Sequence, residues 1–170
     1  MVTGARGLLG QHLIRELLKS GDSVRAFVRK SDDRRFLPPG VEVGVGDITS
    51  FSEVRAAMVG CDSIIHACST HIYNMPPDRF WEINVGGTKN VCDAASALRC
   101  QRVVFTSTIS TLASVSACGI ARPPAGTPAR KLMSISKRAA EDHVLAYAQH
   151  GLPAIVVNPT YFIGPYDQPF

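Results

Sequence analysis

Short apolar runs and amphipathic stretches alternate along the whole chain. The apolar runs, within residues 23–28, 41–47, 61–68, 102–108 and 152–160, lack the polar–apolar alternation of half-exposed strands. Such runs are typical of strands that are covered on both faces. Between them, apolar positions at helical spacing predict helices over residues 8–21, 50–60, 79–98 and 131–151. The order predicts one α/β domain over residues 1–170, a doubly wound parallel sheet in three α/β/α layers.

Two local signals refine this pattern. Ser50 and Glu53 stand three residues apart at the start of a predicted helix, which is the spacing of a capping box. Proline and glycine cluster within residues 116–130, so we expect a loop there, near the ligand crevice. No internal repeat and no linker divides the chain.

The stretch TGARGLLG places Gly4, Gly7 and Gly10 just before the first predicted helix. Glycines at a strand-to-helix turn let the backbone approach a pyrophosphate, which then faces the free N–H groups of the helix. A plain tight turn also uses glycine, but the helix that follows favours nucleotide binding. We therefore expect the three glycines, with Arg6 and Leu9 between them, to contact a dinucleotide.

The second predicted strand ends in a basic residue. An acidic residue that binds the ribose hydroxyls would stand about 20 residues after the glycines, but this chain has Arg29 there, followed by Lys30. A guanidinium can bind a 2′-phosphate through two hydrogen bonds, and Arg6 could reach the same phosphate. This favours NADP(H) over NAD(H) as the cofactor. The alternative is that Arg29 only faces solvent.

Charge, hydropathy and cysteine content argue against nucleic-acid-binding, membrane-spanning and metal-binding proteins. The net charge is +4, and the one modest basic cluster is too sparse for nucleic-acid binding. No apolar run reaches the ~18–20 residues of a membrane span, and no leader opens the chain, so we expect a cytoplasmic protein without a membrane partner. Five cysteines without C-x-x-C spacing favour reduced, buried thiols over metal or redox use, and we expect no metal.

Several motifs together resemble one known family. They are TGARGLLG, GDI at residues 46–48, HAC at 66–68, NVGGTKN at 84–90, FTST at 105–108, SKRAAE at 136–141 and NPTYFIGP at 158–165. The ordered set is similar to the extended short-chain dehydrogenase/reductases, above all the NAD-dependent epimerase/dehydratase group and its dihydroflavonol-4-reductase-like branch. The resemblance spans essentially the whole chain. It implies a Rossmann-type fold, a nicotinamide dinucleotide, and oxidoreductase or epimerase activity on a carbonyl or sugar-like small molecule.

The same resemblance implies roles for individual residues. Those that match cofactor contacts are Asp47 and Ile48 beside the adenine, Ala67 and Cys68 under the ribose and phosphates, and Pro159 and Thr160 against the nicotinamide. Thr108 matches the hydroxyl that binds the substrate oxygen. Lys137 matches the lysine that holds the nicotinamide ribose and lowers the pKa of a tyrosine. Asn84 matches a position whose amide ties helix to strand; for Thr108 and Asn84, ordinary local hydrogen bonding is the alternative.

The chain departs from the family at its central chemical device. The family places a tyrosine four residues before the lysine, where it transfers a proton, but Met133 stands at that position here. A thioether has no proton to give, and loss of a general acid typically lowers the rate ~10²–10⁴-fold. Tyr147 lies too far along the helix, and Tyr161 follows the next strand. We therefore expect impaired catalysis; the alternative is a non-catalytic NADP(H)-binding module or sensor.

Length is the second departure. Only Met1 and Val2 precede Thr3, whereas the family's fold normally has a strand of roughly five or six residues at this place. Family members also continue well past NPTYFIGP into a substrate-binding lobe. We expect a truncated relative with a shortened first strand and no such lobe. A fragment with neither activity nor tight cofactor binding is a third, weaker alternative. A homodimer could form through the helices that end near Leu98 and His150.

Overall fold

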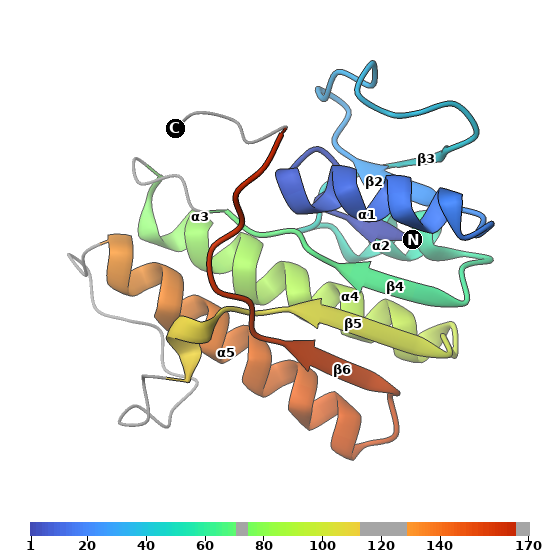
Figure 1. Cartoon of the computed structure of the whole chain (residues 1–170). Helices are drawn as coiled ribbons and strands as arrows, with labels where there is room; N and C mark the ends of the chain where they lie inside the picture. The colour runs from blue at the N-terminus through green and yellow to red at the C-terminus, as the bar shows by residue number, and fades with distance from the viewer. Residues whose placement is uncertain (71–74, 113–128, 166–170) are drawn as a thin grey trace.

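Six parallel strands form the centre of the molecule (Figure 1). The computed structural model describes residues 1–70, 75–112 and 129–165. The strands are β1 (Val2–Thr3), β2 (Arg25–Val28), β3 (Glu42–Val45), β4 (Ser63–His66), β5 (Arg102–Thr106) and β6 (Ala154–Val157). Their order is β3-β2-β1-β4-β5-β6, and each neighbouring pair is parallel. This order is that of a Rossmann-type sheet, so the predicted fold class is confirmed.

Helices cover both faces of this sheet. They are α1 (Leu8–Lys19), α2 (Phe51–Met58), α3 (Pro77–Trp81), α4 (Gly87–Ala97) and α5 (Ala129–Gln149). A π-helical turn, Glu82–Gly86, joins α3 to α4, so the predicted helix over residues 79–98 is continuous but locally widened. In Figure 1, α2, α4 and α5 lie on one side of the sheet and α1 on the other.

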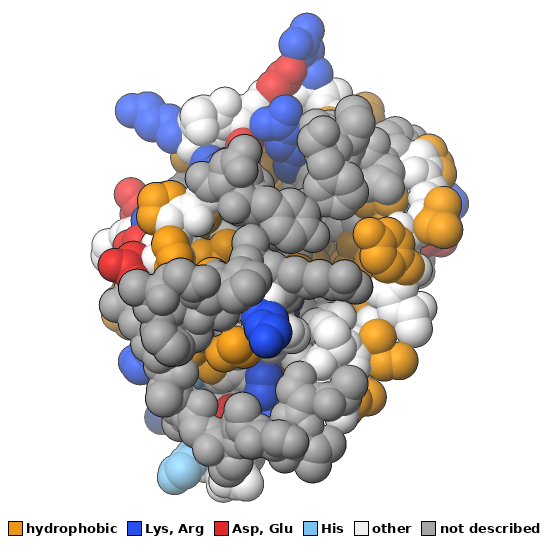
Figure 2. All heavy atoms as spheres, turned by 90° about the vertical axis from the view of Figure 1, so that its left-hand side faces the viewer, with side chains coloured by type: hydrophobic (Ala, Val, Ile, Leu, Met, Phe, Trp, Pro, Cys, Tyr) orange, Lys and Arg blue, Asp and Glu red, His pale blue; other side chains and the backbone are white. Residues whose placement is uncertain are grey.

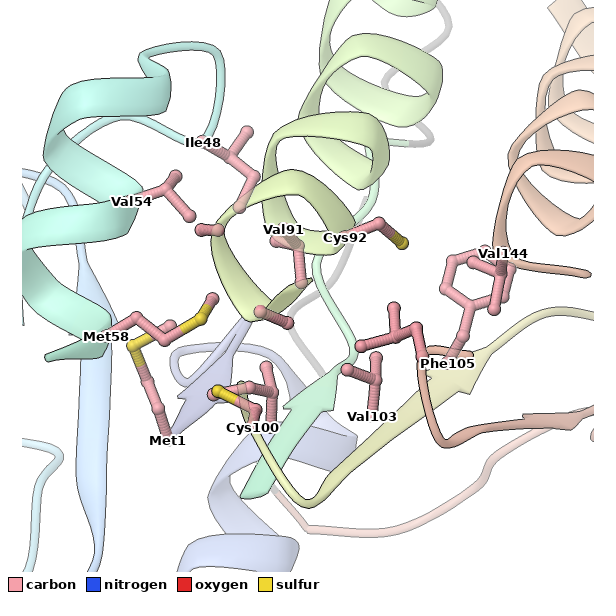
Figure 3. Close-up of a cluster of buried hydrophobic side chains, with 14 of the residues drawn as sticks. Met1, Ile48, Val54, Met58, Val91, Cys92, Cys100, Val103, Phe105 and Val144 are labelled. Atoms are coloured by element: carbon pink, nitrogen blue, oxygen red, sulfur yellow. The ribbon is translucent and has the colours of Figure 1, made fainter. Parts of the chain in front are cut away.

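The larger core lies between the sheet and the three helices on one face (Figure 3). Val103 and Phe105 of β5 point into it and meet Val91 of α4 and Val144 of α5. These four side chains are at most 1% exposed. Because side chains alternate along a strand, the residues between them point to the other face of the sheet.

A smaller core lies under α1. There Ile14 packs over Val2, Ala26 and Val28 of the two strands β1 and β2. Both faces of these strands are therefore covered, which explains their unbroken apolar pattern.

The same expectation is wrong for the two edge strands. In β3, Val43 and Val45 are 39% and 41% exposed. In β6, Ile155 and Val157 are 49% and 41% exposed. These side chains are exposed because, within the described part of the chain, no helix lies over those edges of the α1 face.

The strand β1 is short but central. Val2 pairs with Ala26 and Ile65, and Thr3 pairs with Phe27 and His66 on the two neighbouring strands. The order of the sheet changes direction at this strand, between β1 and β4. In open α/β sheets the carboxyl ends of the strands at such a point form the ligand crevice.

The predicted capping box of α2 is wrong in its hydrogen bonds. Ser50 is the N-cap residue, but its side chain makes no capping hydrogen bond, and its hydroxyl lies 3.2 Å from that of Ser52. Glu53 instead accepts a 2.7 Å hydrogen bond from the N–H of Asp47. The turn after β3 brings that amide within reach, so Glu53 ties α2 to the loop before it.

Candidate functional site

The glycine turn packs so tightly that side chains are excluded from two of its positions. Gly4 has φ +69°, and a Cβ there would lie 2.7 Å from the carbonyl carbon of Ala67. A Cβ on Gly10 would lie 2.2 Å from the oxygen of Gly4. Both glycines are therefore required by the close approach of the turn to α1 and to the loop after β4. This contact brings the predicted cofactor residues Ala67 and Cys68 beside the turn.

The third glycine leaves the start of α1 open. Gly7 is the N-cap residue, no side chain caps the helix, and its first turn carries no acidic residue. A Cβ on Gly7 would meet only the oxygen of Gly4, at 3.3 Å, among the described residues. The first N–H groups of a helix have no partner within the helix and attract an anion. The turn thus fits a diphosphate, and Leu9 lies in the helical turn that would face it.

Arg6 and Arg29 converge on one carboxylate. Arg29 donates to Asp32 from its backbone N–H at 2.9 Å and from Nη2 at 3.0 Å. Arg6 Nη1 lies 3.6 Å from the same carboxylate. The two arginines that the sequence predicts at a 2′-phosphate therefore lie together, and the sequence did not indicate the Asp32 between them.

The two residues predicted beside the adenine lie after β3, where Gly46 leads into α2. Asp47 accepts hydrogen bonds from the N–H and hydroxyl of Thr49 and pairs with Arg79 at 3.2 Å. Burial raises its pKa, but these partners outweigh that effect and hold the pKa below the usual value. The side chain of Ile48 is buried against Gly87 of α4, so only a small part of it could meet a ligand.

Lys137 lies at the carboxyl ends of the central strands. Its Nζ donates to the carbonyl of Thr106 at 2.7 Å and lies 4.9 Å from the centroid of the Phe105 ring. Burial lowers the pKa of Lys137 to about 8, and the thiol of Cys68 is near enough to oppose this shift. Burial also raises the pKa of that thiol to about 11, so Cys68 stays protonated near neutral pH.

Thr108 stands just past β5, next to the segment that follows β6. Asn158 donates to the carbonyl of Thr108 at 3.3 Å, and Ile109 donates to that of Pro159 at 2.9 Å. The exposed Thr160 follows. In Figure 1 this segment then runs across the strand ends toward α1. The candidate catalytic and nicotinamide residues therefore share the edge of the sheet that carries the glycine turn.

The described serine hydroxyls near Met133, and that of Tyr147, donate hydrogen bonds to backbone carbonyls or to Asp93 and so do not replace the missing phenol. Met133 lies in α5 one helical turn before Lys137. Ser134 donates to the carbonyl of Lys131, and Ser136 donates to that of Met133. Tyr147 donates to Asp93 on α4. Tyr161 is 82% exposed beyond β6. The loop predicted over residues 116–130 lies almost wholly outside the described residues.

Buried polar side chains tie the site together, and sequence analysis assigned only one of them. Asn84, in the π-helical turn, exchanges hydrogen bonds with the backbone of Thr70 and donates to Ser136 at 3.0 Å. The predicted tie was from helix to strand, whereas these partners lie in the segment after β4 and in α5. His66 contacts Thr3 at 2.7 Å and Thr88 at 3.0 Å. A histidine within an apolar strand was the available signal, because a buried ring must find partners.

Glu141 was quoted within a motif but given no role. Its Oε2 accepts hydrogen bonds from Ser107 at 2.6 Å and from Thr111 and Asn158 at 3.0 Å. It lies one helical turn after Lys137, on the buried side of α5. The carboxylate therefore fixes the end of β5 and the segment after β6 around Thr108.

The stability of the chain should depend on pH through His66. Burial, and secondarily the charge of Lys137, lowers the pKa of His66 from 6.5 to about 3. The folded state thus keeps the ring neutral while the unfolded state takes up a proton below pH 6.5, so stability falls as pH falls. We expect a loss of about 2 kcal/mol in the free energy of unfolding between pH 7.5 and pH 5.

Urea denaturation followed by circular dichroism checks this expectation. A His66→Gln variant should be less stable overall and should lose most of the pH dependence. A His150→Gln variant, at an exposed position near the end of α5, should keep it. An unchanged slope in His66→Gln would show that other groups cause the pH dependence.

Figure 2 looks onto the left-hand side of Figure 1, toward which the strands point. Basic side chains gather at its upper end, over the loop that follows β2. In the described ranges, no three His, Cys, Asp or Glu side chains are grouped to hold a metal ion. Likewise, none of the described helices is long and apolar enough to cross a bilayer.

Comparisons with known proteins agree on the relatives of this chain. A model of the NAD dependent epimerase/dehydratase family matches residues 1–170. A Synechocystis protein, provisionally named dihydroflavonol 4-reductase, is 31% identical over 98% of this chain and 50% of its own length. The chain thus spans about half the length of the curated relatives it matches.

Solved structures give the same fold. The crystal structure of gox2253 has a TM-score of 0.76 and 28% identity, over 93% of this chain and 50% of the other. The Thermus thermophilus UDP-glucose 4-epimerase, solved with NAD, has a TM-score of 0.75 at 23% identity, over 92% of this chain and 53% of its own, and supports the fold alone. Because the family model matches this chain over residues 1–170, the chain belongs to the NAD dependent epimerase/dehydratase family.

Proposed function

We propose that this chain binds NADP(H) and belongs to an oxidoreductase- or epimerase-type site for a carbonyl or sugar-like substrate. One observation carries the proposal: the open N-terminus of α1, the glycine turn and Lys137 meet at the edge where the order of the sheet reverses. The name of one relative, a reductase 31% identical to this chain, and the family description support the same class of chemistry.

Each part of the site has a distinct role in this proposal. The dinucleotide, when bound, would supply or accept a hydride. The N–H groups of the α1 turn and the glycine backbone would hold its diphosphate. Lys137 would hold the nicotinamide ribose by moving its Nζ from the carbonyl of Thr106, and Thr108 would orient the substrate oxygen.

Because Met133 stands where the family has a tyrosine, we expect a slow catalytic rate. No phenol stands one helical turn before Lys137, so the proton must come from water or from the hydroxyl of Thr108, which are weaker acids. Turnover is therefore expected to be slow. The same residue favours the second candidate function, a non-catalytic NADP(H)-binding module. NADPH oxidation with a panel of small aldehydes and ketones separates the two: measurable turnover supports the enzyme, and binding without turnover supports the module.

The preference for NADP(H) rests on the two convergent arginines. Arg29 and Arg6 each keep about half or more of the side chain exposed, at 65% and 47%. A 2′-phosphate placed there would gain charge-assisted hydrogen bonds worth ~1.5–3 kcal/mol. An Arg29→Gln variant should thus bind NADPH about 10- to 100-fold more weakly and NADH nearly as before.

Isothermal titration calorimetry with both dinucleotides measures this change. Arg35→Gln is the matched control, since Arg35 lies in the same loop and, among the described residues, pairs with the exposed Asp33 rather than with Asp32. It should leave both affinities within about twofold. Equal weakening of NADPH and NADH in Arg29→Gln would contradict the 2′-phosphate assignment.

Further parts of the proposal concern the whole protein. We propose that substrate specificity depends on a lobe outside this chain and on the loop over residues 116–130. Self-association through α4 and α5 is also proposed, and these helices pack side by side on one face of the sheet. Four free cysteines among the described residues suit a reducing, cytoplasmic setting.

A further inference from the structure

Asp32 is held at the centre of the proposed 2′-phosphate site. Its side chain is only 7% exposed, although it lies in a loop at the edge of the molecule. The carboxylate of Asp32 accepts hydrogen bonds from the backbone N–H of Arg29 and from Nε and Nη2 of the Arg29 guanidinium. The backbone N–H of Asp32 in turn donates to the carbonyl of Arg29 at 3.1 Å. The carboxylate is thus fixed by the backbone as well as by the side chain.

The neighbouring Asp33 provides a contrast. Asp33 pairs with Arg35 at 2.6 Å, but the two side chains are 47% and 91% exposed. An ion pair as exposed to solvent as this one contributes little to the stability of the fold. The two adjacent carboxylates therefore carry the same charge in different surroundings. Asp32 faces both arginines of the proposed phosphate site, and Asp33 contacts neither of them by a hydrogen bond in the described structure.

We propose that Asp32 is a specificity-determining residue that limits the preference of this site for NADPH over NADH. Its carboxylate occupies Nε and Nη2 of Arg29 and lies beside Arg6, so an incoming 2′-phosphate finds fewer free donors. The carboxylate also repels the phosphate at short range. This inference rests on the proposed function, because it concerns the cofactor bound there.

The charge on Asp32 persists under ordinary conditions. Burial raises the pKa of this carboxyl, but the hydrogen bonds and charges of Arg29, with that of Arg6, outweigh burial and hold the pKa below its usual value. Near neutral pH the group is therefore ionised, and it cannot release the arginines by taking up a proton. With Asp32 charged, the three side chains carry a net charge of about +1 rather than +2.

Asp32→Asn tests the proposal. The amide oxygen can still accept the N–H of Arg29, so the turn should be kept while the negative charge is removed. We expect NADPH to bind about five- to tenfold more tightly and NADH to change less than about twofold. Asp33→Asn makes the same change in net charge one residue away and should leave both affinities nearly unchanged. Asp32→Ser, which keeps a small acceptor, is a second variant.

Calorimetry with two smaller probes isolates the adenosine end. Adenosine 2′,5′-bisphosphate should gain affinity in Asp32→Asn, and adenosine 5′-monophosphate should not. An unchanged or reduced preference for the 2′-phosphate in both Asp32 variants would overturn this inference alone. If neither dinucleotide binds the unmodified chain or any variant, the proposed function fails, and this inference fails with it.

Discussion

Met133→Tyr is expected to raise the rate of NADPH-dependent reduction of small aldehydes about 10²- to 10⁴-fold. The new phenol would lie on α5 one helical turn before Lys137, on the same face of the helix. The ammonium group of Lys137 would favour the phenolate form and so lower the pKa of the tyrosine. Small aldehydes are the appropriate substrates because they need no contacts from a separate lobe.

The control for this variant is Met133→Phe, which adds the ring without the hydroxyl. It should bind NADPH as tightly as the unmodified chain and gain no activity. Initial rates of NADPH oxidation at saturating cofactor, with thermal unfolding as a check on folding, make the comparison. Equal rates in the unmodified chain and in Met133→Tyr would show that another group supplies the proton.

Gly7→Asp is expected to abolish dinucleotide binding, by more than about 100-fold, while keeping the fold. Gly7 has φ −69° and ψ 163°, an extended conformation that any residue can adopt. Aspartate is a better N-cap residue than glycine by only about a few tenths of a kcal/mol, and its Cβ would lie 3.3 Å from the oxygen of Gly4, so stability should stay within roughly 0.5 kcal/mol of the unmodified chain. Its carboxylate would bond the free N–H groups of α1 and repel the diphosphate.

Gly7→Asn separates charge from occupancy at the same position. The amide has the same shape and also caps a helix, but it carries no charge. It should weaken NADPH binding less than Gly7→Asp does, and the difference measures the charge repulsion. Binding that survives intact in Gly7→Asp, in a folded protein, would place the dinucleotide elsewhere.

The sequence predicts the sheet well because local patterns determine it. The apolar runs, the helical spacing and the glycine turn all follow from neighbours in the chain, and each strand appears within a few residues of its predicted range. The exposed faces of the edge strands β3 and β6 were not predictable in this way. Ile155 and Val157 lie in an apolar run like those of the buried strands, and only the three-dimensional arrangement shows which face lacks a helix.

The sequence predicts site residues where the backbone conformation or a close contact allows only one residue type. Gly4 and Gly10 are such positions, because a Cβ would collide with a neighbouring backbone. The hydrogen-bond and ion-pair partners of side chains cannot be predicted from residue type in this way. Asp32 lies in a charged loop whose sequence does not say which arginine each acid meets, and Glu141 accepts hydrogen bonds from donors on two separate segments, one after β5 and one after β6. Long-range pairing of this kind depends on the finished fold.

The central claim is that the turn between β1 and α1 binds the diphosphate of a nicotinamide dinucleotide. Calorimetric titration of the unmodified chain with NADPH, repeated with Gly7→Asp, tests it most directly. The account predicts saturable one-to-one binding that Gly7→Asp loses while its far-ultraviolet circular dichroism stays the same. Absence of saturable binding by the unmodified chain, or equal binding by both proteins, would contradict it.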